Sequence, residues 1–136
     1  MAKDARLTRV THVLVHMAGH GGLAASDRIA EMLGTNPVVV RRMMGLLRNA
    51  GLVRSTAGAR GGWQLTRELR DITLLEVHRA LQSSVFSIDA GTMAAPCKVE
   101  RAANEAIAGA LDTGRQAFEN ALANITLDDV RAATSL

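Results

Sequence analysis

The chain has 136 residues, enough for one domain with a hydrophobic core and one appended element. Its net charge of +3 is unevenly distributed: residues 1–70 carry eleven Lys or Arg against four Asp or Glu, and residues 71–136 carry five against nine. One Trp and two Phe are too few for a platform that stacks single-stranded bases. The sequence has no paired carboxylates, P-loop or dinucleotide fingerprint, so it does not predict an enzyme.

A first helix is predicted over residues 6–19, because apolar residues recur there at intervals of three and four. His12 and His16 are four residues apart on this helix, a spacing that can bind a metal ion. Since no third ligand is near in the sequence, we interpret both histidines as structural and predict no metal site.

Two short helices joined by a tight turn are predicted next. Residues 24–33 have helical apolar spacing with Ser26 as the expected cap, and Gly34 opens a turn into a third helix. This arrangement is typical of a helix-turn-helix motif, in which the second helix of the pair reads DNA.

The third helix has a clear start and a clear end. Asn36 precedes a proline and therefore suits the extended N-cap position, while Pro37 suits the first helical position, where no backbone N–H is needed. The helix should run to about Ala50, and Gly51 is placed to end it.

At about 100° per residue, one face of this helix is apolar and the opposite face is not. The outward face combines two arginines with an exposed valine and a glycine: Val38, Arg41, Arg42 and Gly45. Arginine can bond the O6 and N7 atoms of guanine, a valine methyl can touch thymine, and glycine lets the backbone approach DNA. We therefore predict that this face, with Asn36 and Pro37 at its start, binds a major groove; the alternative is an ordinary solvated helix face.

A β-hairpin is predicted after the third helix. Residues 52–56 favour a strand, residues 57–62 are small apart from Arg60, and residues 63–66 favour a second strand. A hairpin in this position is a wing. Arg60 could reach into a minor groove, and the backbone at Gly61 and Gly62 could lie close to phosphates.

Four stretches of the sequence carry a family resemblance: residues 36–42 (NPVVVRR), 47–53 (LRNAGLV), 60–65 (RGGWQL) and 72–77 (ITLLEV). With these stretches the chain resembles the Rrf-type winged-helix regulators of bacteria, which include IscR, NsrR and CymR, and above all their YwnA-like branch. The resemblance implies a homodimeric, sequence-specific transcription factor that binds double-stranded DNA, with repression the expected mode. A MarR-like or PadR-like regulator and a protein-docking winged helix remain alternatives.

A fourth helix should start at Thr73, because Thr73 and Glu76 form a capping box and Ile72 with Val77 forms the accompanying hydrophobic staple. Residues 1–82 therefore form the predicted winged helix-turn-helix domain. Residues 83–96 have no clear pattern and are interpreted as a connecting loop.

Residues 97–136 are predicted to form a long helix and a short last helix, completing a mainly α fold with a small β-hairpin wing. Small residues dominate one stripe of the long helix, which can approach a partner closely but buries too little against a small domain alone. A symmetric partner helix would complete the burial, and the dimer would read a pseudo-palindrome; the alternative is a hairpin with the first helix. The stripe contains Ala103, Ile107, Ala110, Gly114, Phe118 and Ala121.

Cys97 is the only cysteine and lies at the expected start of the long helix, close to Lys98 and Arg101. A helix N-terminus and adjacent cations favour thiolate, which makes Cys97 a candidate redox sensor; the alternative is a small buried apolar residue. The resemblance implies three cysteines in this region for relatives that hold an iron–sulfur cluster. Since this chain has only Cys97, we predict no cluster and no cofactor. The alternative is a cluster or metal site to which His12 of the first helix adds a ligand.

Two further expectations concern the surroundings of the protein. A small-molecule effector between the winged domain and the long helix is as compatible with the sequence as a redox signal, and no residue set identifies it. Since the sequence has no long apolar run and no signal-peptide pattern, we expect a soluble protein of the bacterial cytoplasm, associated with the nucleoid and not with a membrane.

Overall fold

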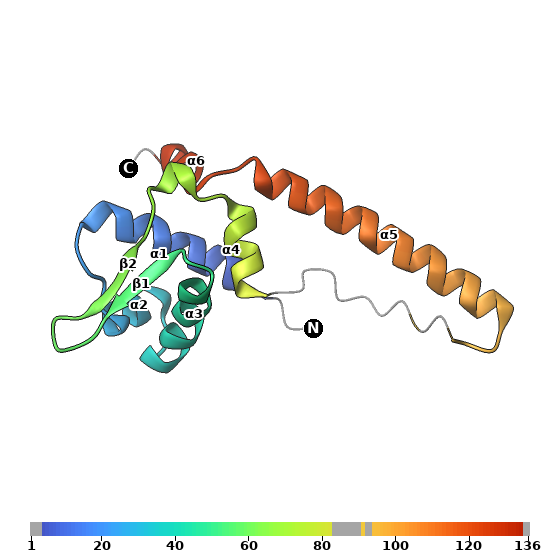
Figure 1. The fold of residues 1–136 in the computed structure, drawn as a ribbon, viewed down its shortest axis with the longest axis horizontal. Coiled ribbons are helices and arrows are strands. Elements are labelled where there is room, and N and C mark those ends of the chain that lie inside the picture. Colours follow the sequence, from blue (N-terminus) through green and yellow to red (C-terminus); the bar gives the residue numbers. More distant parts are fainter. Residues whose placement is uncertain (1–3, 83–90, 92–93, 135–136) are drawn as a thin grey trace.

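The computed structural model of the chain describes residues 4–82, 91 and 94–134. The described elements are α1 (Arg6–His20), α2 (Ser26–Leu33), α3 (Pro37–Asn49), β1 (Val53–Thr56), β2 (Gly62–Leu65), the 3-10 helix η1 (Leu69–Asp71), α4 (Leu74–Leu81), α5 (Lys98–Ala123) and α6 (Leu127–Ala133). The predicted mainly helical fold with one β-hairpin and a long C-terminal helix is confirmed (Figure 1). The predicted connecting loop over 83–96 lies mostly outside the described residues.

One hydrophobic core joins the helices and the hairpin. Leu14 of α1, Ile29 of α2 and Leu47 of α3 are all fully buried, and Leu127 of α6 belongs to the same cluster. Each such side chain contributes about 1.5 to 3 kcal/mol by leaving water. The core therefore fixes the angle of α3 relative to the elements that surround it.

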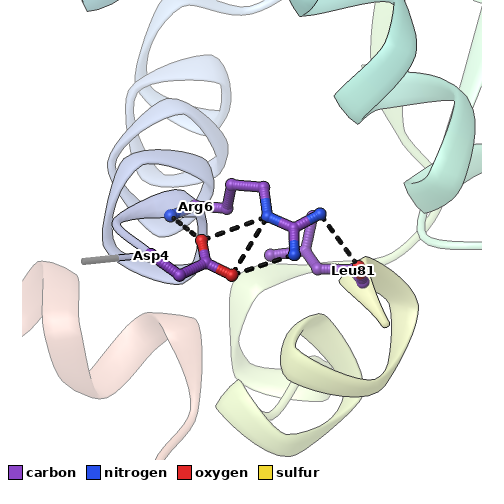
Figure 2. A network of polar contacts seen from close by, with 3 residues as sticks. All are labelled: Asp4, Arg6 and Leu81. Atoms are coloured by element: carbon purple, nitrogen blue, oxygen red, sulfur yellow. Dashed lines mark hydrogen bonds and ion pairs between the residues drawn. The ribbon is translucent and has the colours of Figure 1, made fainter. Parts of the chain in front are cut away.

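Figure 2 shows how the start of α1 is tied to the end of α4. The Arg6 guanidinium contacts the Asp4 carboxylate, with Nη2 2.9 Å from Oδ2, and its Nη1 donates to the Leu81 carbonyl oxygen at 3.4 Å. Hydrogen bonding to Arg6 holds the pKa of Asp4 below its usual value. Because Leu81 is the last residue of α4, the guanidinium also meets the negative end of that helix dipole.

The start of α2 differs from the prediction. Ala25, not Ser26, is the N-cap residue, and no side chain caps the helix. The Ser26 hydroxyl instead accepts a hydrogen bond of 2.9 Å from the indole Nε1 of Trp63. The prediction was wrong because a buried indole N–H needs an acceptor, and Ser26 supplies it.

The hairpin is held on two sides. Strands β1 and β2 pair antiparallel with Ser55 opposite Trp63. On its other side, Trp63 exchanges two backbone hydrogen bonds of 2.9 Å with Ala24, in the loop between α1 and α2. The wing is therefore attached to the helix-turn-helix by backbone and side chain together.

The predicted capping box of α4 is confirmed, since Thr73 and Glu76 bond each other's backbone N–H groups. The segment before α6 pairs with the segment before α4: the Leu74 amide donates to the Ile125 carbonyl at 2.8 Å, and the Leu127 amide donates to the Ile72 carbonyl at 2.9 Å. The C-terminal end of α5 is thereby fixed to the winged unit. The rest of α5 projects away from it (Figure 1).

Helix α5 has 26 residues, of which Leu122 alone is buried. It packs against α4, where the rings of His78 and Phe118 meet edge to face at 5.5 Å. Within the described ranges, neither α5 nor any other helix is long and apolar enough to cross a membrane.

Candidate nucleic-acid interface

The start of α3 is built as the sequence predicts. Asn36 is extended, with φ −116° and ψ 159°, and its Oδ1 accepts hydrogen bonds from the amides of Val38 at 3.0 Å and Val39 at 3.1 Å. Pro37 occupies the first turn, and the helix ends at Asn49. Because the cap is made within the helix itself, the first turn is ordered before any partner binds.

The outward face of α3 carries the four side chains that the sequence places there. Val38 is 59% exposed, Arg41 and Arg42 are exposed, and Gly45 is half-buried. A methyl group at Gly45 would meet no atom of a neighbouring element within 4 Å, so the space directly outside this position is open. The opposite face is core: Val40, Met43, Met44 and Leu47.

Arg41 lies in a hollow of about 430 Å³ that the start of α2, α3 and the wing enclose together. The wing contributes residues 55–59, and α2 contributes Asp27. The Arg41 Nε donates to the Pro37 carbonyl at 3.3 Å, so the side chain lies along its own helix. Asp27, which has no functional signal in the sequence, lines the same hollow as Arg41.

The tip of the wing is a tight turn. The Gly61 amide donates to the Gly58 carbonyl at 2.9 Å, and Gly58 has φ +102°, which favours glycine. Arg60 lies inside this turn and is exposed. The turn therefore presents one guanidinium beyond the end of both strands.

Gly61 and Gly62 have an internal role that the sequence analysis missed. A Cβ at Gly61 would overlap the Thr56 carbonyl oxygen, and a Cβ at Gly62 would lie 2.6 Å from the Ala24 carbonyl oxygen. Both glycines are thus required by the packing of the hairpin, whether or not their backbone meets a phosphate. The constraint on Gly62 comes from Ala24, which is distant in the sequence, so no local pattern could have revealed it.

Cys97 is exposed, so the alternative of a buried apolar residue is wrong. It is the N-cap residue of α5, and its sulfur makes no capping hydrogen bond of ordinary geometry. Even so, the backbone amides of Glu100 and then Val99 point toward the sulfur and lower the pKa of the thiol. Arg101, which the sequence suggested as a source of the shift, donates instead to the carbonyl oxygens of Ala95 and Pro96.

The predicted dimer stripe of α5 is only partly covered by its own chain. Val99, which continues the stripe toward the N-terminus, is 76% exposed and Ile107 is 42% exposed. Ala103, Ala110 and Ala121 are exposed, whereas Gly114 and Phe118 are half-buried beside α4. Among the residues that the structure describes, the N-terminal half of the stripe is therefore left exposed.

His12, His16 and His20 follow one another at intervals of four residues along α1, and the rings of His16 and His20 stack with their centroids 6.2 Å apart. The rings of His12 and His16 lie 4.7 Å apart, with His12 exposed and His16 half-buried. Among the residues that the structure describes, no group of three His, Cys, Asp or Glu side chains could hold a metal ion. An iron–sulfur cluster takes up to four thiolates, and a chain with one cysteine does not fit it.

These elements define a winged helix-turn-helix protein: two helices joined by a turn, a hairpin after the second helix, and a long helix beyond. The family model of Rrf2, described as an iron-dependent transcriptional regulator, matches residues 4–133. The chain belongs to the Rrf2 family of transcriptional regulators, whose members bind DNA, and it is not an enzyme. Membership excludes the MarR-like and PadR-like alternatives.

Known proteins of similar sequence or structure support this assignment. YwnA of Bacillus subtilis, described as a helix-turn-helix-type regulator, is 35% identical over 129 residues, which are 93% of this chain and 95% of YwnA. A crystal structure described as a DNA-binding protein has 35% identity and a TM-score of 0.76 over 92% of this chain and 97% of its own. The oxidised form of Staphylococcus aureus CymR has 26% identity and a TM-score of 0.68 over 96% of each chain.

The substitution Gly45→Ala should change the free energy of unfolding and the affinity for duplex DNA in opposite directions. Alanine is favoured over glycine inside a helix by about 0.5 to 1 kcal/mol, and the space at Gly45 is open, so the free energy of unfolding in urea should rise by that amount. The affinity for duplex DNA should fall, because a methyl group would hold the helix away from the groove floor. Gly109→Ala in α5, where the space is equally open, is the matched control and should change stability alone. Unchanged affinity in Gly45→Ala would mean that this backbone does not approach DNA.

The lowered pKa of Cys97 predicts reactivity at unusually low pH. Iodoacetamide reacts with the thiolate and not with the thiol. The alkylation rate of the folded protein should therefore rise at a lower pH than that of the urea-unfolded protein, whose thiol has the ordinary pKa of about 8.5. The rate is measured from pH 5 to 10 by mass spectrometry. Coincident pH profiles for the two states would remove the helix amides as the cause.

Proposed function

We propose that the protein is a homodimeric, sequence-specific repressor that binds a pseudo-palindromic operator in the bacterial cytoplasm. The observation that carries the proposal is the hollow in which Arg41 of α3 lies beside the wing. This hollow contains Arg41, while Arg42 is exposed on the same helix and Arg60 on the turn of the wing. A duplex presents a major groove beside a minor groove, which α3 and the wing could occupy together.

In this proposal the first turns of α3 enter the major groove. Arg41 and Arg42 bond guanine edges or phosphates, and Val38 contacts a thymine methyl. At the start of α3, Asn36 and Pro37 bring the positive end of the helix dipole toward a phosphate. Val38 is 59% exposed and is therefore accessible for contact with a thymine methyl.

The wing would contact the neighbouring minor groove. Arg60 extends beyond the strands and can enter a narrow groove, while the backbone at Gly61 and Gly62 lies against phosphates. Support comes from the charge distribution, since the half of the chain that contains α3 and the wing carries the excess of Lys and Arg. A protein-docking winged helix would have an apolar outward face and little salt dependence.

The dimer would form through α5. The exposed apolar stripe of Ala103, Ile107 and Ala110 is compatible with a partner helix at short distance, because small side chains let backbones approach. The further stripe residues Gly114, Phe118 and Ala121 lie nearer α4 and would join the edge of the interface. Two copies of α3 would then face two half-sites of one operator.

We further propose that a redox signal acts at Cys97. The exposed thiolate would attack peroxide, forming a sulfenic acid and releasing hydroxide, which takes a proton to become water. Oxidation would occur at the start of the helix that carries the dimer stripe, so it could alter the distance between the two copies of α3 in the dimer. Cys97→Ser should keep DNA binding and lose its response to peroxide.

Arg41→Ala tests the reading of DNA. On the preferred duplex selected from random sequence, the variant should lose about 1 to 3 kcal/mol of binding free energy and tolerate any base at the position that Arg41 contacts. Arg70→Ala is the matched control, since Arg70 is an exposed arginine outside α3 and the wing whose ion pair with Glu68 is solvated. Binding is measured by fluorescence anisotropy across a salt series. Equal weakening on all sequences would make Arg41 a phosphate contact, and salt-insensitive binding would sink the DNA-binding proposal.

Ala110→Glu tests the dimer. A charge in the stripe should convert a particle of twice 14.4 kDa into one of 14.4 kDa in analytical ultracentrifugation and weaken operator binding. Ala108→Glu is the control, because Ala108 is exposed about 200° around the same helix and should leave the dimer intact. A monomeric wild type, or equal effects of both variants, would contradict the proposed interface.

A further inference from the structure

A second hollow lies at the corner between the end of α1 and the start of α2. It has a volume of about 280 Å³ and shares no lining residue with the hollow that Arg41 occupies. Gly21 and Gly22, both with positive φ, form one wall and leave its space open. The volume is at the lower end of the roughly 300 to 1,000 Å³ of small-molecule sites, so it suits a ligand with a single ring.

The lining combines an apolar floor with cationic and hydrogen-bonding groups at the rim. Met17 and Ile29 are buried and Met32 is half-buried, which gives the floor two thioethers. Arg28 and His20 stand at the rim, and both are exposed. Within the described residues, the Arg28 side chain has no ion pair or hydrogen bond, so its guanidinium is available to a ligand.

We propose that this hollow binds an aromatic monocarboxylate. A guanidinium forks onto a carboxylate with two parallel hydrogen bonds, which Arg28 can offer without breaking any contact in the protein. Methionine sulfur packs favourably against aromatic rings, which Met17 and Met32 can both do from the floor. The ring would therefore lie on the two thioethers, with its carboxylate toward Arg28 and His20.

The ligand would act on the wing through Ala24. Ala24 lines the hollow, and its backbone makes the two 2.9 Å hydrogen bonds that hold Trp63 in place. The hollow exists in the conformation in which the wing is attached, and a ligand stabilises the conformation that it binds. An aromatic carboxylate should therefore favour the attached wing and tighten DNA binding; this consequence rests on the proposed function, whereas the binding site does not.

The test is a titration of the full chain, carrying ¹³C-methyl methionine, with benzoate. The methyl signals of Met17 and Met32 should shift with a dissociation constant of about 0.1 to 1 mM, as expected for a ligand of this size. Met43 and Met44, buried in the core of α3, should not shift. Substitution of each methionine by leucine assigns the signals.

Two comparisons identify the chemistry of the site. Arg28→Gln should weaken benzoate binding about tenfold or more, and Arg70→Gln, another exposed arginine, should leave it unchanged. Benzamide has the ring without the charge, so the wild type and Arg28→Gln should bind benzamide with the same affinity. No shift at Met17 and Met32, equal shifts at every methyl, or equal binding of benzoate and benzamide would overturn the proposal.

A second arm measures duplex affinity with and without benzoate. Tighter binding in the wild type, absent in Arg28→Gln, supports the coupling to the wing. Methyl shifts with unchanged duplex affinity would overturn the coupling and leave the site standing. Methyl shifts in a protein that binds no duplex under any condition would instead count against the proposed function.

Discussion

The attachment of Trp63 to the loop before α2 is the contact on which the geometry of the reading surface depends. The indole donates to Ser26, and the backbone of the same residue pairs with Ala24. A two-stranded hairpin is marginal in water by itself. Joined to a third segment and to the core through a buried tryptophan, it becomes a fixed part of the helix-turn-helix, and Arg60 and Arg41 acquire a defined relative position.

The same attachment explains the small residues around it. Gly62 must be glycine because the Ala24 carbonyl lies where a side chain would begin, and Gly61 must be glycine because the turn folds back onto Thr56. The proposed carboxylate site is lined by Ala24 of this loop, and the hollow at Arg41 is lined by the next residue, Ala25. A change at one of these residues can therefore reach the other without travelling through the core.

Local patterns in the sequence predict much of the fold. The Asn36-Pro37 start of α3, the capping box at Thr73 and the exposed face with Val38 are set by residues within one or two helical turns of each other, so periodicity and cap chemistry suffice. The family resemblance adds the order of the elements. The comparisons confirm that order and the regulator class, while the individual DNA contacts and the dimer stripe remain predictions.

What the sequence does not predict depends on contacts between distant residues. Ser26 has the chemistry of a cap, and only the position of Trp63, 37 residues later, assigns its hydroxyl elsewhere. The nearness of Arg101 to Cys97 suggested an electrostatic effect, but the guanidinium turns to two carbonyl oxygens instead. The return of Leu127 to the core of the winged unit likewise depends on the pairing of segments about fifty residues apart.

Dimethyl sulfate footprinting on the selected operator tests whether α3 and the wing occupy separate grooves, because this reagent methylates guanine N7 in the major groove and adenine N3 in the minor groove. We expect the wild type to protect guanine N7 where α3 lies and adenine N3 where the wing lies. Arg60→Ala should restore methylation of the adenines while the guanines stay protected. Protection of the guanines alone in the wild type, or loss of both protections together in Arg60→Ala at saturating protein, would contradict a wing that reads its own groove.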